Sequence, residues 1–407
     1  MKIYHRLRTR LVAIFCMVTL IPILITGIYA IQVSSKTLRA QALLTQTEQA
    51  KTLKNNLFSF LNTTKGDLLF LAQSPAMTDY LSLRSTISPR YNSETEDDSA
   101  PQNALESQRQ TLEQEFLALS RNRRIYYQIR YLDETGQEVV RVDADGLISQ
   151  IVERAKRQDK SDRYYFKKTM RLSRQRIFVS PLDLNREKGE IGIPHKPVIR
   201  YAVNVYDNQN RQAGIVITNV DASQFLNLLD EVRLVNQAGY FMSHPDLTGE
   251  RRWGGPNDLD TGYSLEKEYP QLATKIRGQD GTISTPTITL SHLRVPIAGT
   301  TRHWTLIIQQ DTDDILKSVT KFRTTFIIIL VVAVVIALVL ALLFSARITR
   351  PIEYLTRTAD AISKGDLVNN RVEVKDKGEI GQLARAFERM RVSMIKSFER
   401  LRKQTRT

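Results

Sequence analysis

The chain has 407 residues, of which 42% are hydrophobic and 25% are charged, with a formal net charge of +15 and one cysteine. This length suits two or three domains with a sizeable core. The single cysteine, Cys16, excludes an intramolecular disulfide, a cysteine-based zinc site and an iron–sulfur cluster within this chain.

Two long uncharged stretches decide the class of protein. Residues 11–35 and 324–346 contain no formal charge and are mostly apolar. About 20 helical residues cross the hydrocarbon core of a bilayer, so we predict transmembrane helices at 11–33 and 324–346. The basic residues before the first stretch would also suit a signal peptide. The stretch is longer than usual for one and lacks a good cleavage pattern, which favours a retained anchor.

The distribution of basic residues favours, by a small margin, an inside location for both termini. The terminal flanks of the two stretches contain slightly more Lys and Arg than the flanks within the long loop. Residues 1–10 would then be cytoplasmic and residues 34–323 extracytoplasmic. Most of the net positive charge lies in the terminal flanks, which indicates attraction to membrane lipid rather than nucleic-acid binding.

Two amphipathic helices are predicted after the second stretch. Pro351 is followed by apolar residues at helical spacing until Gly365, which is a good helix stop. A second helix begins near Asp376 to Glu379, and its apolar residues form one stripe: Ile380, Leu383, Phe387, Met390, Met394, Phe398 and Leu401. Two short helices of this kind cannot bury their apolar faces alone, but four from two chains can form a parallel bundle.

Residues 347–401 resemble the HAMP domain of bacterial transmembrane receptors, and residues 402–407 would be a short tail. The resemblance rests on Pro351 beside the membrane, Gly365-Asp366-Leu367, and the segment from Gly378 through Glu379 to Leu383, followed by Phe387 and Met390. It implies a cytoplasmic homodimeric bundle. Pro351 would set the exit from the membrane helix, and Glu379 would cap the second helix. The signalling residues it implies are Pro351, Gly365, Glu379, Leu383, Phe387 and Met390, with Phe387 and Met390 as core packing.

The long loop begins with helices and continues into two similar segments. Helices are predicted over residues 34–83 and 104–120, with a polar loop between them. Each segment then has a hairpin and later paired strands that end in an aspartate followed by a helix. This repeat predicts two modules, a distal one over about 120–230 and a proximal one over about 231–315, each an antiparallel sheet with helices on it.

The two modules resemble the double Cache sensor of bacterial receptors, in which PAS-like modules precede histidine kinases, diguanylate cyclases and chemoreceptor signalling domains. The resemblance rests on the segments YLDETGQEVVRVD, DKSDRYYFKKT, VSPLDLNREKGEIGIPHKPVIRYAVNVYD and LVNQAGYFMSHPD. It implies an α+β fold, with a long first helix and tandem modules outside the membrane, and a ligand in the distal module.

In that family an Arg-x-aromatic-aromatic run and a later aspartate line the ligand pocket. The resemblance places these roles on Arg163, Tyr165, Phe166 and Asp183, while Gln158 stands where the amino-acid-binding branch has a tyrosine. A guanidinium can bind a carboxylate or phosphate, and an aspartate can bind an ammonium or hydroxyl group.

Two further arginines are candidates for an anionic ligand. Arg141 and Arg200 lie on adjacent predicted strands and could add positive charge to the pocket. The alternative for each arginine, Arg163 included, is a surface ion pair or packing of its stem, and for Tyr165 and Phe166 it is a place in the core.

Catalysis finds no support in the motifs. The five histidines are scattered, and the sequence has no H-E-x-x-H, P-loop or G-x-S-x-G pattern. Asp143 and Asp145 are not followed by the glutamate of an EF-hand. We therefore expect no catalytic residues, no metal, no cofactor and no enzymatic activity.

These features predict a homodimeric signal-transduction receptor of the inner membrane. It would sense a small extracytoplasmic ligand and transmit the signal through HAMP to an output partner in trans, such as a kinase, cyclase or phosphatase. Coupling requires only that the ligand binds two packings with different affinity. Two alternatives stay open: a truncated input half of a sensor histidine kinase or diguanylate cyclase, and a membrane binding or tethering subunit that does not switch.

Overall fold

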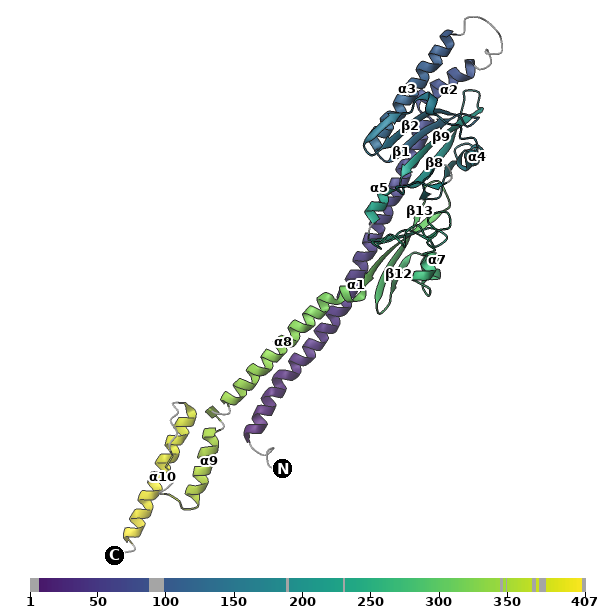
Figure 1. The fold of residues 1–407 in the computed structure, drawn as a ribbon. Coiled ribbons are helices and arrows are strands. Elements are labelled where there is room, and N and C mark those ends of the chain that lie inside the picture. Colours follow the sequence, from purple (N-terminus) through teal and green to yellow (C-terminus); the bar gives the residue numbers. More distant parts are fainter. Residues whose placement is uncertain are drawn as a thin grey trace. The chain divides into compact units, whose positions relative to one another are not determined.

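The computed structural model has two compact units, 41–314 and 1–40 with 315–407, which are described separately. The residues it describes are 7–87, 99–187, 190–229, 231–344, 347–348, 350–367, 371–372 and 378–404. Figure 1 shows the helices and strands in chain order. The fold is α+β with antiparallel sheets, as predicted.

Three helices precede the strands: α1 (Leu7–Ala72), α2 (Pro75–Ile87) and α3 (Ser99–Arg123). The sequence predicts one helix over 34–83, but the structure breaks it after Ala72. Proline lacks a backbone N–H and suits the first position of a new helix, and Pro75 occupies that position in α2. The Ser74 hydroxyl then accepts a hydrogen bond from the Met77 N–H at 3.2 Å, which caps the new helix.

The distal sheet has the strand order β3-β2-β1-β9-β8-β4, with β5 also paired to β8. Its strands are β1 (Tyr126–Leu132), β2 (Glu138–Asp145), β3 (Ile148–Ile151), β4 (Ile177–Val179), β5 (Asp183–Leu184), β8 (Pro197–Tyr206) and β9 (Gln212–Asp221). The first hairpin turns at Asp133, whose carboxylate accepts the N–H groups of Thr135 and Gln137 at 2.9 and 3.1 Å. Gly136 has a φ of 95°, which glycine adopts without strain.

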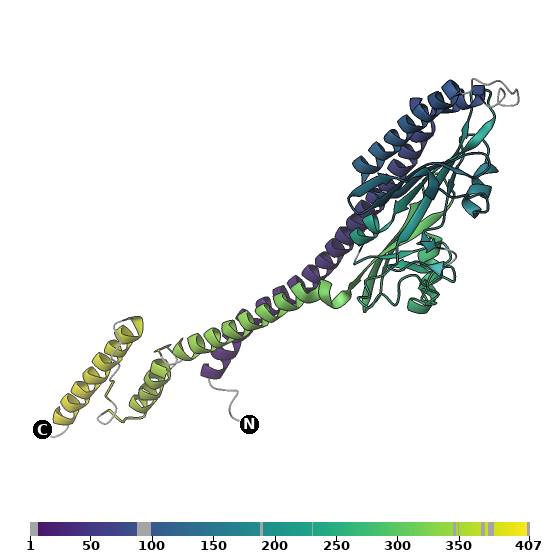
Figure 2. The ribbon, with the colours of Figure 1, turned by 45° about the horizontal axis from the view of Figure 1, so that its top comes forward.

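Short elements lie between these strands and after them. They are the 3₁₀ turns η2 (Arg154–Lys156) and η3 (Asn227–Leu229), the helices α4 (Tyr164–Met170) and α5 (Ser223–Leu226), and a small ribbon of β6 (Arg186–Glu187) and β7 (Glu190–Ile191). Figure 2 shows α3 packed against the distal sheet beside α1. The helices therefore cover one face of this sheet.

The proximal sheet has the strand order β11-β10-β14-β13-β12. Its strands are β10 (Arg233–Val235), β11 (Phe241–Ser243), β12 (Gly281–Ser284), β13 (Ile288–Pro296) and β14 (His303–Asp311). Two short helices, α6 (Leu265–Glu268) and α7 (Ala273–Gly278), lie between β11 and β12. Strand β14 ends at Asp311, and the helix α8 (Thr312–Phe344) begins at the next residue.

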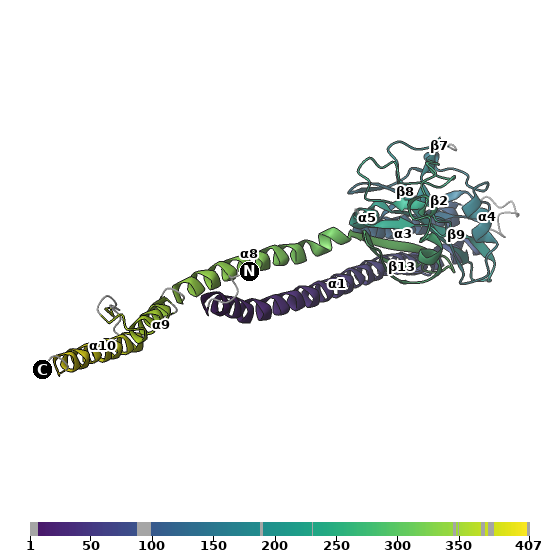
Figure 3. The ribbon, with the colours of Figure 1, turned by 90° about the horizontal axis from the view of Figure 1, so that it is seen from below.

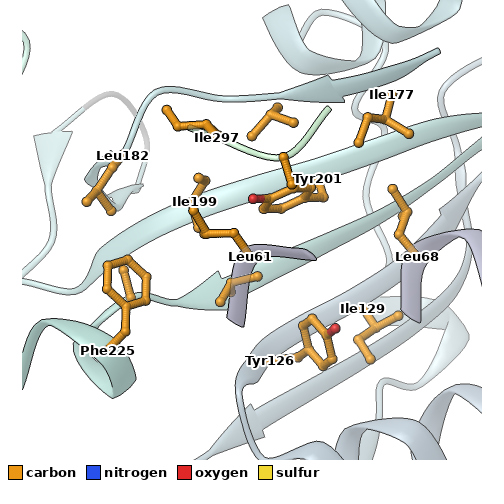
Figure 4. Packing of buried hydrophobic residues seen from close by; sticks show 14 of the residues in the cluster. Leu61, Leu68, Tyr126, Ile129, Ile177, Leu182, Ile199, Tyr201, Phe225 and Ile297 are labelled. Atoms are coloured by element: carbon orange, nitrogen blue, oxygen red, sulfur yellow. The ribbon is translucent and has the colours of Figure 1, made fainter. Parts of the chain in front are cut away.

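One hydrophobic core joins α1 to both sheets. Leu61 and Leu68 of α1 lie against the buried faces of the distal strands, as the labelled residues in Figure 4 show. The same cluster includes Phe225 and Trp304, whose rings stack with centroids 5.9 Å apart. Because Trp304 belongs to β14, the two modules share this core. Burial of such apolar area is the main stabilising contribution to a fold of this kind.

In the other unit, α8 lies beside the first part of α1 (Figure 3). The rings of Phe15 and Phe344 are 6.4 Å apart, and Gly27 faces the ring of Phe326. Both helices are long and apolar enough to cross a membrane. Their large apolar side chains are mostly exposed, as expected for surfaces that contact lipid.

The same unit ends with α9 (Arg350–Ser363) and α10 (Glu379–Gln404), which run in the same direction (Figure 1). Leu355, Ile362, Val372 and Ala384 form their shared core. Gly365 has a φ of 98°, and the Asp366 N–H donates to the Ala361 carbonyl at 3.1 Å, a hydrogen bond that closes the end of α9.

Candidate functional site

The distal sheet has a polar cavity of about 880 Å³ on the face opposite α1 and α3. The sheet has one apolar face and one polar face because successive side chains of a strand point to opposite faces. On β1, Ile129 and Tyr131 enter the core, whereas Gln128 and Arg130 line the cavity. The cavity lining is Tyr127, Gln128, Arg130, Arg141, Asp143, Ala144, Asp145, Ile148, Gln150, Gln158, Asp159, Lys160, Arg163, Tyr165, Asn185, Arg186, Lys196, Arg200 and Asn219.

The strand register aligns one row of polar residues across the floor of the cavity. Asp143, Gln128, Asn219 and Arg200 are successive partners on β2, β1, β9 and β8. Gln128 donates to Asp143 at 2.8 Å, and Asn219 donates to Gln128 at 3.1 Å. These hydrogen bonds fix the orientation of the amides, so the floor is preorganised.

Arg130 lines the cavity and is only 3% exposed. Its guanidinium donates to Glu138 and to the Tyr165 hydroxyl, both at 3.2 Å, and lies 5.4 Å from the centre of the Tyr165 ring. Among the described residues, nothing accepts a hydrogen bond from its Nε atom. A buried hydrogen-bond donor without an acceptor lowers the stability of a folded protein. Such groups are rare, so the Nε–H group of Arg130 calls for a functional explanation.

Glu138 binds two arginines that face each other across the hairpin. Arg130 and Arg141 are direct cross-strand partners, and the Glu138 carboxylate lies 3.2 and 3.3 Å from them. The side chain of Glu138 is fully buried. Glu138 also accepts the backbone N–H of Gln158 at 3.0 Å, which attaches the loop before α4 to the sheet. Arg141 also forms an ion pair with Asp143 at 2.7 Å.

A second ion pair lies at the edge of the cavity, where an adjoining hollow of about 220 Å³ opens beside α4. Arg200 donates to Asp183 at 3.0 Å and to Asn185 at 3.3 Å. Burial raises the pKa of Asp183, although Arg200 opposes that rise. Arg163 and Tyr165 line both spaces, so the two form one continuous candidate site.

Five of the six ligand residues predicted from the sequence meet at this site: Arg141, Arg163, Tyr165, Asp183 and Arg200. Phe166 does not line either space. It packs in an apolar cluster with Leu132, Ala202, Ile215 and Ile217, the core role given as its alternative. The helical turn of α4 explains the difference, since neighbouring helical residues point about 100° apart.

Sequence reasoning missed Arg130, Glu138 and Asn219. The signal was present in the strand YYQIRYL, where Gln128 and Arg130 alternate with apolar residues. Polar residues at every second position of a strand share a face, and here that face is the one with Arg141 and Arg200.

At the other end of the chain, the predicted HAMP residues lie on α9, α10 and the turn between them. Pro351 is in the first turn of α9, and Glu379 is the first residue of α10. Phe387 packs against the core shared by these helices. Leu383 and Met390 are 47% and 45% exposed, and their spacing of seven residues places both on one face of α10.

A contact that the sequence did not suggest holds the connector against α10. Arg391 donates to the Leu367 carbonyl and to Glu388, both at 2.6 Å. Glu388 accepts the Val372 N–H at 2.9 Å. The hydrogen bond from Arg391, with smaller contributions from Val372, lowers the pKa of Glu388 to about 2, so this carboxylate is ionised at neutral pH.

Two family models match this chain. Residues 92–286 match the family described as bacterial histidine kinase, sensor domain. Residues 343–406 match the HAMP domain. No curated protein is similar enough to match the chain.

Solved structures are similar to the sensor region. A domain of a putative sensory box/GGDEF family protein from Vibrio parahaemolyticus has a TM-score of 0.54 and 23% identity, covering 70% of this chain and 99% of that one. The extracellular domain of a putative histidine kinase, vpHK1S-Z8, has the same TM-score and identity, covering 70% of this chain and 95% of that one. These likenesses concern the fold.

The fold, the two candidate membrane helices and the matched domains define a transmembrane signal-transduction receptor. Within it, residues 92–286 form a sensor domain of the bacterial histidine kinase type, and residues 343–406 form a HAMP domain. The resemblance inferred from the sequence is therefore confirmed in both of its parts.

Proposed function

We propose that the distal cavity binds a small extracytoplasmic ligand and that binding changes the packing of the HAMP helices. The observation that supports this most is the polar cavity of about 880 Å³, which has a preorganised floor and a buried arginine in its lining. Pockets of this size are typical of small-molecule sites. The site would comprise Arg141, Arg163, Tyr165, Asp183 and Arg200, with Arg130 added.

Few structural elements connect the distal cavity to the membrane helix α8. Strand β14 belongs to the sheet that shares a core with the distal module, and α8 begins at the residue after β14. A ligand that favours one arrangement of the modules would bias α8 and hence the HAMP helices that follow it. An output partner that contacts the HAMP helices would receive the signal.

Homodimer formation through HAMP is part of the proposal. Leu383 and Met390 expose apolar surface on one face of α10, and a second copy of the helix pair would bury it. A variant with Cys16→Ser and Leu383→Cys should form an oxidised dimer in membranes. Gln382→Cys, about 100° round the helix, is the matched control and should cross-link much less. Equal cross-linking at both positions would contradict a parallel bundle with Leu383 inside.

We further propose that residues 34–323 face the periplasm and that both termini lie in the cytoplasm of an inner-membrane protein, with basic flanks in contact with anionic lipid. Glu153 and Lys364 are strongly exposed and suit cysteine labelling in a Cys16→Ser background. An impermeant maleimide added to spheroplasts should label Glu153→Cys and not Lys364→Cys. Reversed labelling would refute this orientation.

The signalling step is tested on the full-length receptor in lipid nanodiscs. A ligand should raise the melting temperature of the sensor, because it binds the folded state alone. It should also change the rate of disulfide formation by Leu383→Cys. Arg200→Gln should weaken binding and abolish that change. Binding without any change in cross-linking would instead favour a subunit that does not switch.

A further inference from the structure

We infer that the ligand of the distal cavity is a small hydrophilic anion, with carboxylate or phosphate groups, and that Arg130, Lys160 and Arg163 bind those groups. This inference rests on the proposed function and names the chemical class of its ligand.

Basic side chains outnumber acidic ones around the cavity. Among the residues that the structure describes, seven basic ones line it: Arg130, Arg141, Lys160, Arg163, Arg186, Lys196 and Arg200. Within the same part of the chain, three acidic residues line it: Asp143, Asp145 and Asp159. Glu138 and Asp183 lie against the same arginines, and including them still leaves an excess of positive charge. A ligand with one or two negative charges would balance the site.

The acidic groups in the lining already have partners within the described part of the chain. Asp143 accepts hydrogen bonds from Arg141 at 2.7 Å and Gln128 at 2.8 Å. Asp159 accepts the Ser161 N–H at 2.8 Å, and Asp145 pairs with Lys196 at 3.6 Å. Each of these carboxylates thus already has a donor or a cation beside it, and the surplus of basic residues would repel an ammonium group of a ligand. The cavity therefore favours an anion over an amine.

Several basic groups, in contrast, lack a negative partner. Lys160 contacts the side-chain oxygen of Gln158, which has no charge. Burial lowers the pKa of Lys160, as expected for a cation that is not neutralised. Arg163 forms no ion pair with any residue that the structure describes, and its exposed side chain is free to turn toward a ligand. An anion in the cavity would neutralise Lys160 and Arg163 and would lie beside the buried charge of Arg130.

The walls are polar on most sides. Amide side chains of Gln128, Gln150, Gln158, Asn185 and Asn219 can each donate and accept hydrogen bonds. Apart from two tyrosines, only Ala144 and Ile148 have apolar side chains among the described residues of the lining. Hydroxyl or carbonyl groups would match these amides, whereas a long aliphatic or aromatic group would not. The class is thus a polar carboxylate or phosphate ester.

The test measures binding to the full-length receptor in nanodiscs made of zwitterionic lipid. The probes are malate and citrate for carboxylates, glycerol 3-phosphate and inorganic phosphate for phosphates, and glycerol, malamide and putrescine as uncharged or cationic comparisons. We expect at least one anionic probe to bind, and its affinity to fall as the salt concentration rises. The carboxylate and phosphate probes distinguish the two sources of negative charge.

Variants then assign the site. Lys160→Gln and Arg163→Gln should each weaken binding of the anionic probe about ten- to hundredfold, the usual effect of losing a charged hydrogen bond. Lys167→Gln is the matched control, because Lys167 is an exposed basic residue of α4 outside the cavity. Arg130→Lys keeps the buried charge and should still weaken binding, since an ammonium cannot reproduce the guanidinium contacts.

The results separate this inference from the proposed function. Binding of only an uncharged or cationic probe, lost in Arg200→Gln, would overturn the anionic class and leave the cavity as a ligand site. Anion binding that Lys160→Gln and Arg163→Gln do not weaken would overturn the assignment of these residues. If no probe of any charge binds, the inference is wrong and the proposed ligand site fails with it.

Discussion

The backbone N–H of Leu184 donates a hydrogen bond to the carboxylate of Asp258 at 3.3 Å. Leu184 lies on β5 beside Asp183, at the edge of the distal cavity, whereas Asp258 lies in a loop of the proximal segment. Arg186 strengthens the junction by donating to the Asn257 carbonyl at 2.8 Å. Residues that line the cavity therefore contact the module that leads to α8.

This junction should make stability depend on pH. Burial raises the pKa of Asp258 to about 6 from an ordinary value of 3.8, although the hydrogen bond from Leu184 opposes the rise, and Asp183 adds to it. Between about pH 4 and pH 6 the folded protein binds more protons than the unfolded chain, so the free energy of unfolding falls as pH rises. Asp258→Asn removes this charge and should stabilise the sensor at pH 7.5 by about 1 kcal/mol, allowing for solvent screening.

Melting curves of both proteins at pH 4.5, 6 and 7.5 provide the check. The advantage of Asp258→Asn should grow with pH and become small near pH 4.5. Asp260→Asn is the control, because the neighbouring Asp260 is exposed. An advantage that is the same at all three pH values would show that ionisation of Asp258 is not its source.

Glu138→Gln should destabilise the sensor strongly. The change leaves Arg130 and Arg141 opposite each other without the carboxylate between them. Removing one partner of a buried ion pair typically costs about 3–5 kcal/mol. The melting temperature should fall by several degrees, whereas Glu153→Gln at an exposed site should leave it unchanged. A fall of similar size in both variants would contradict this explanation.

Alanine substitutions at two glycines should change the stability of the sensor in opposite directions. Gly214 has a φ of 120°, and a Cβ there would lie 2.0 Å from the Leu132 carbonyl oxygen. Gly214→Ala should therefore lower the stability by more than about 1 kcal/mol. Gly66 lies within α1, where a Cβ meets no atom within 4 Å, so Gly66→Ala should stabilise by about 0.5–1 kcal/mol. Chemical denaturation of both variants tests the two signs.

Arg391→Ala should release the connector of the HAMP domain. It removes the hydrogen bonds from Arg391 to the Leu367 carbonyl and to Glu388. Glu388 is itself the acceptor of the Val372 N–H, so it loses the group that orients it. Hydrogen exchange at Val372 should become faster by about tenfold or more, while exchange in the middle of α8 stays the same. Arg389→Ala, on the exposed side of α10, is the control. Unchanged exchange at Val372 would mean that this contact does not hold the connector.

Much of the fold could be predicted because its signals are local. Turn residues such as Asp133 and Gly136 and the alternation of apolar residues define the hairpins before any tertiary contact is known. The break in the first helix was also signalled, since Pro75 cannot continue a regular helix from the preceding turn. The short helices α6 and α7 were missed because they are only four and six residues long and depend on packing more than on periodicity.

The site was harder to predict because it depends on register between distant strands. Arg130 reaches Asn219 only through the pairing of β1 with β9, 89 residues away along the chain. The sequence also does not tell whether an arginine within a strand is buried or exposed. Arg130 can be buried because Glu138 pairs with it, and that contact depends on the register of the hairpin. Arg163 and Asp183 were found through family resemblance, and resemblance could not tell that Phe166 belongs to the core.

Strand β14 ends at Asp311 and α8 begins at Thr312, with no linker between them. This direct connection has a practical consequence for chimeric receptors. Each residue of an α-helix turns the chain by about 100°. Exchanging this sensor for another one with a single residue more or less at that point would rotate α8, and everything that follows it, by about 100° relative to the sensor. Fusions made there should therefore be built as a series of successive lengths, and the ones that signal should recur about every seventh residue, after two full turns.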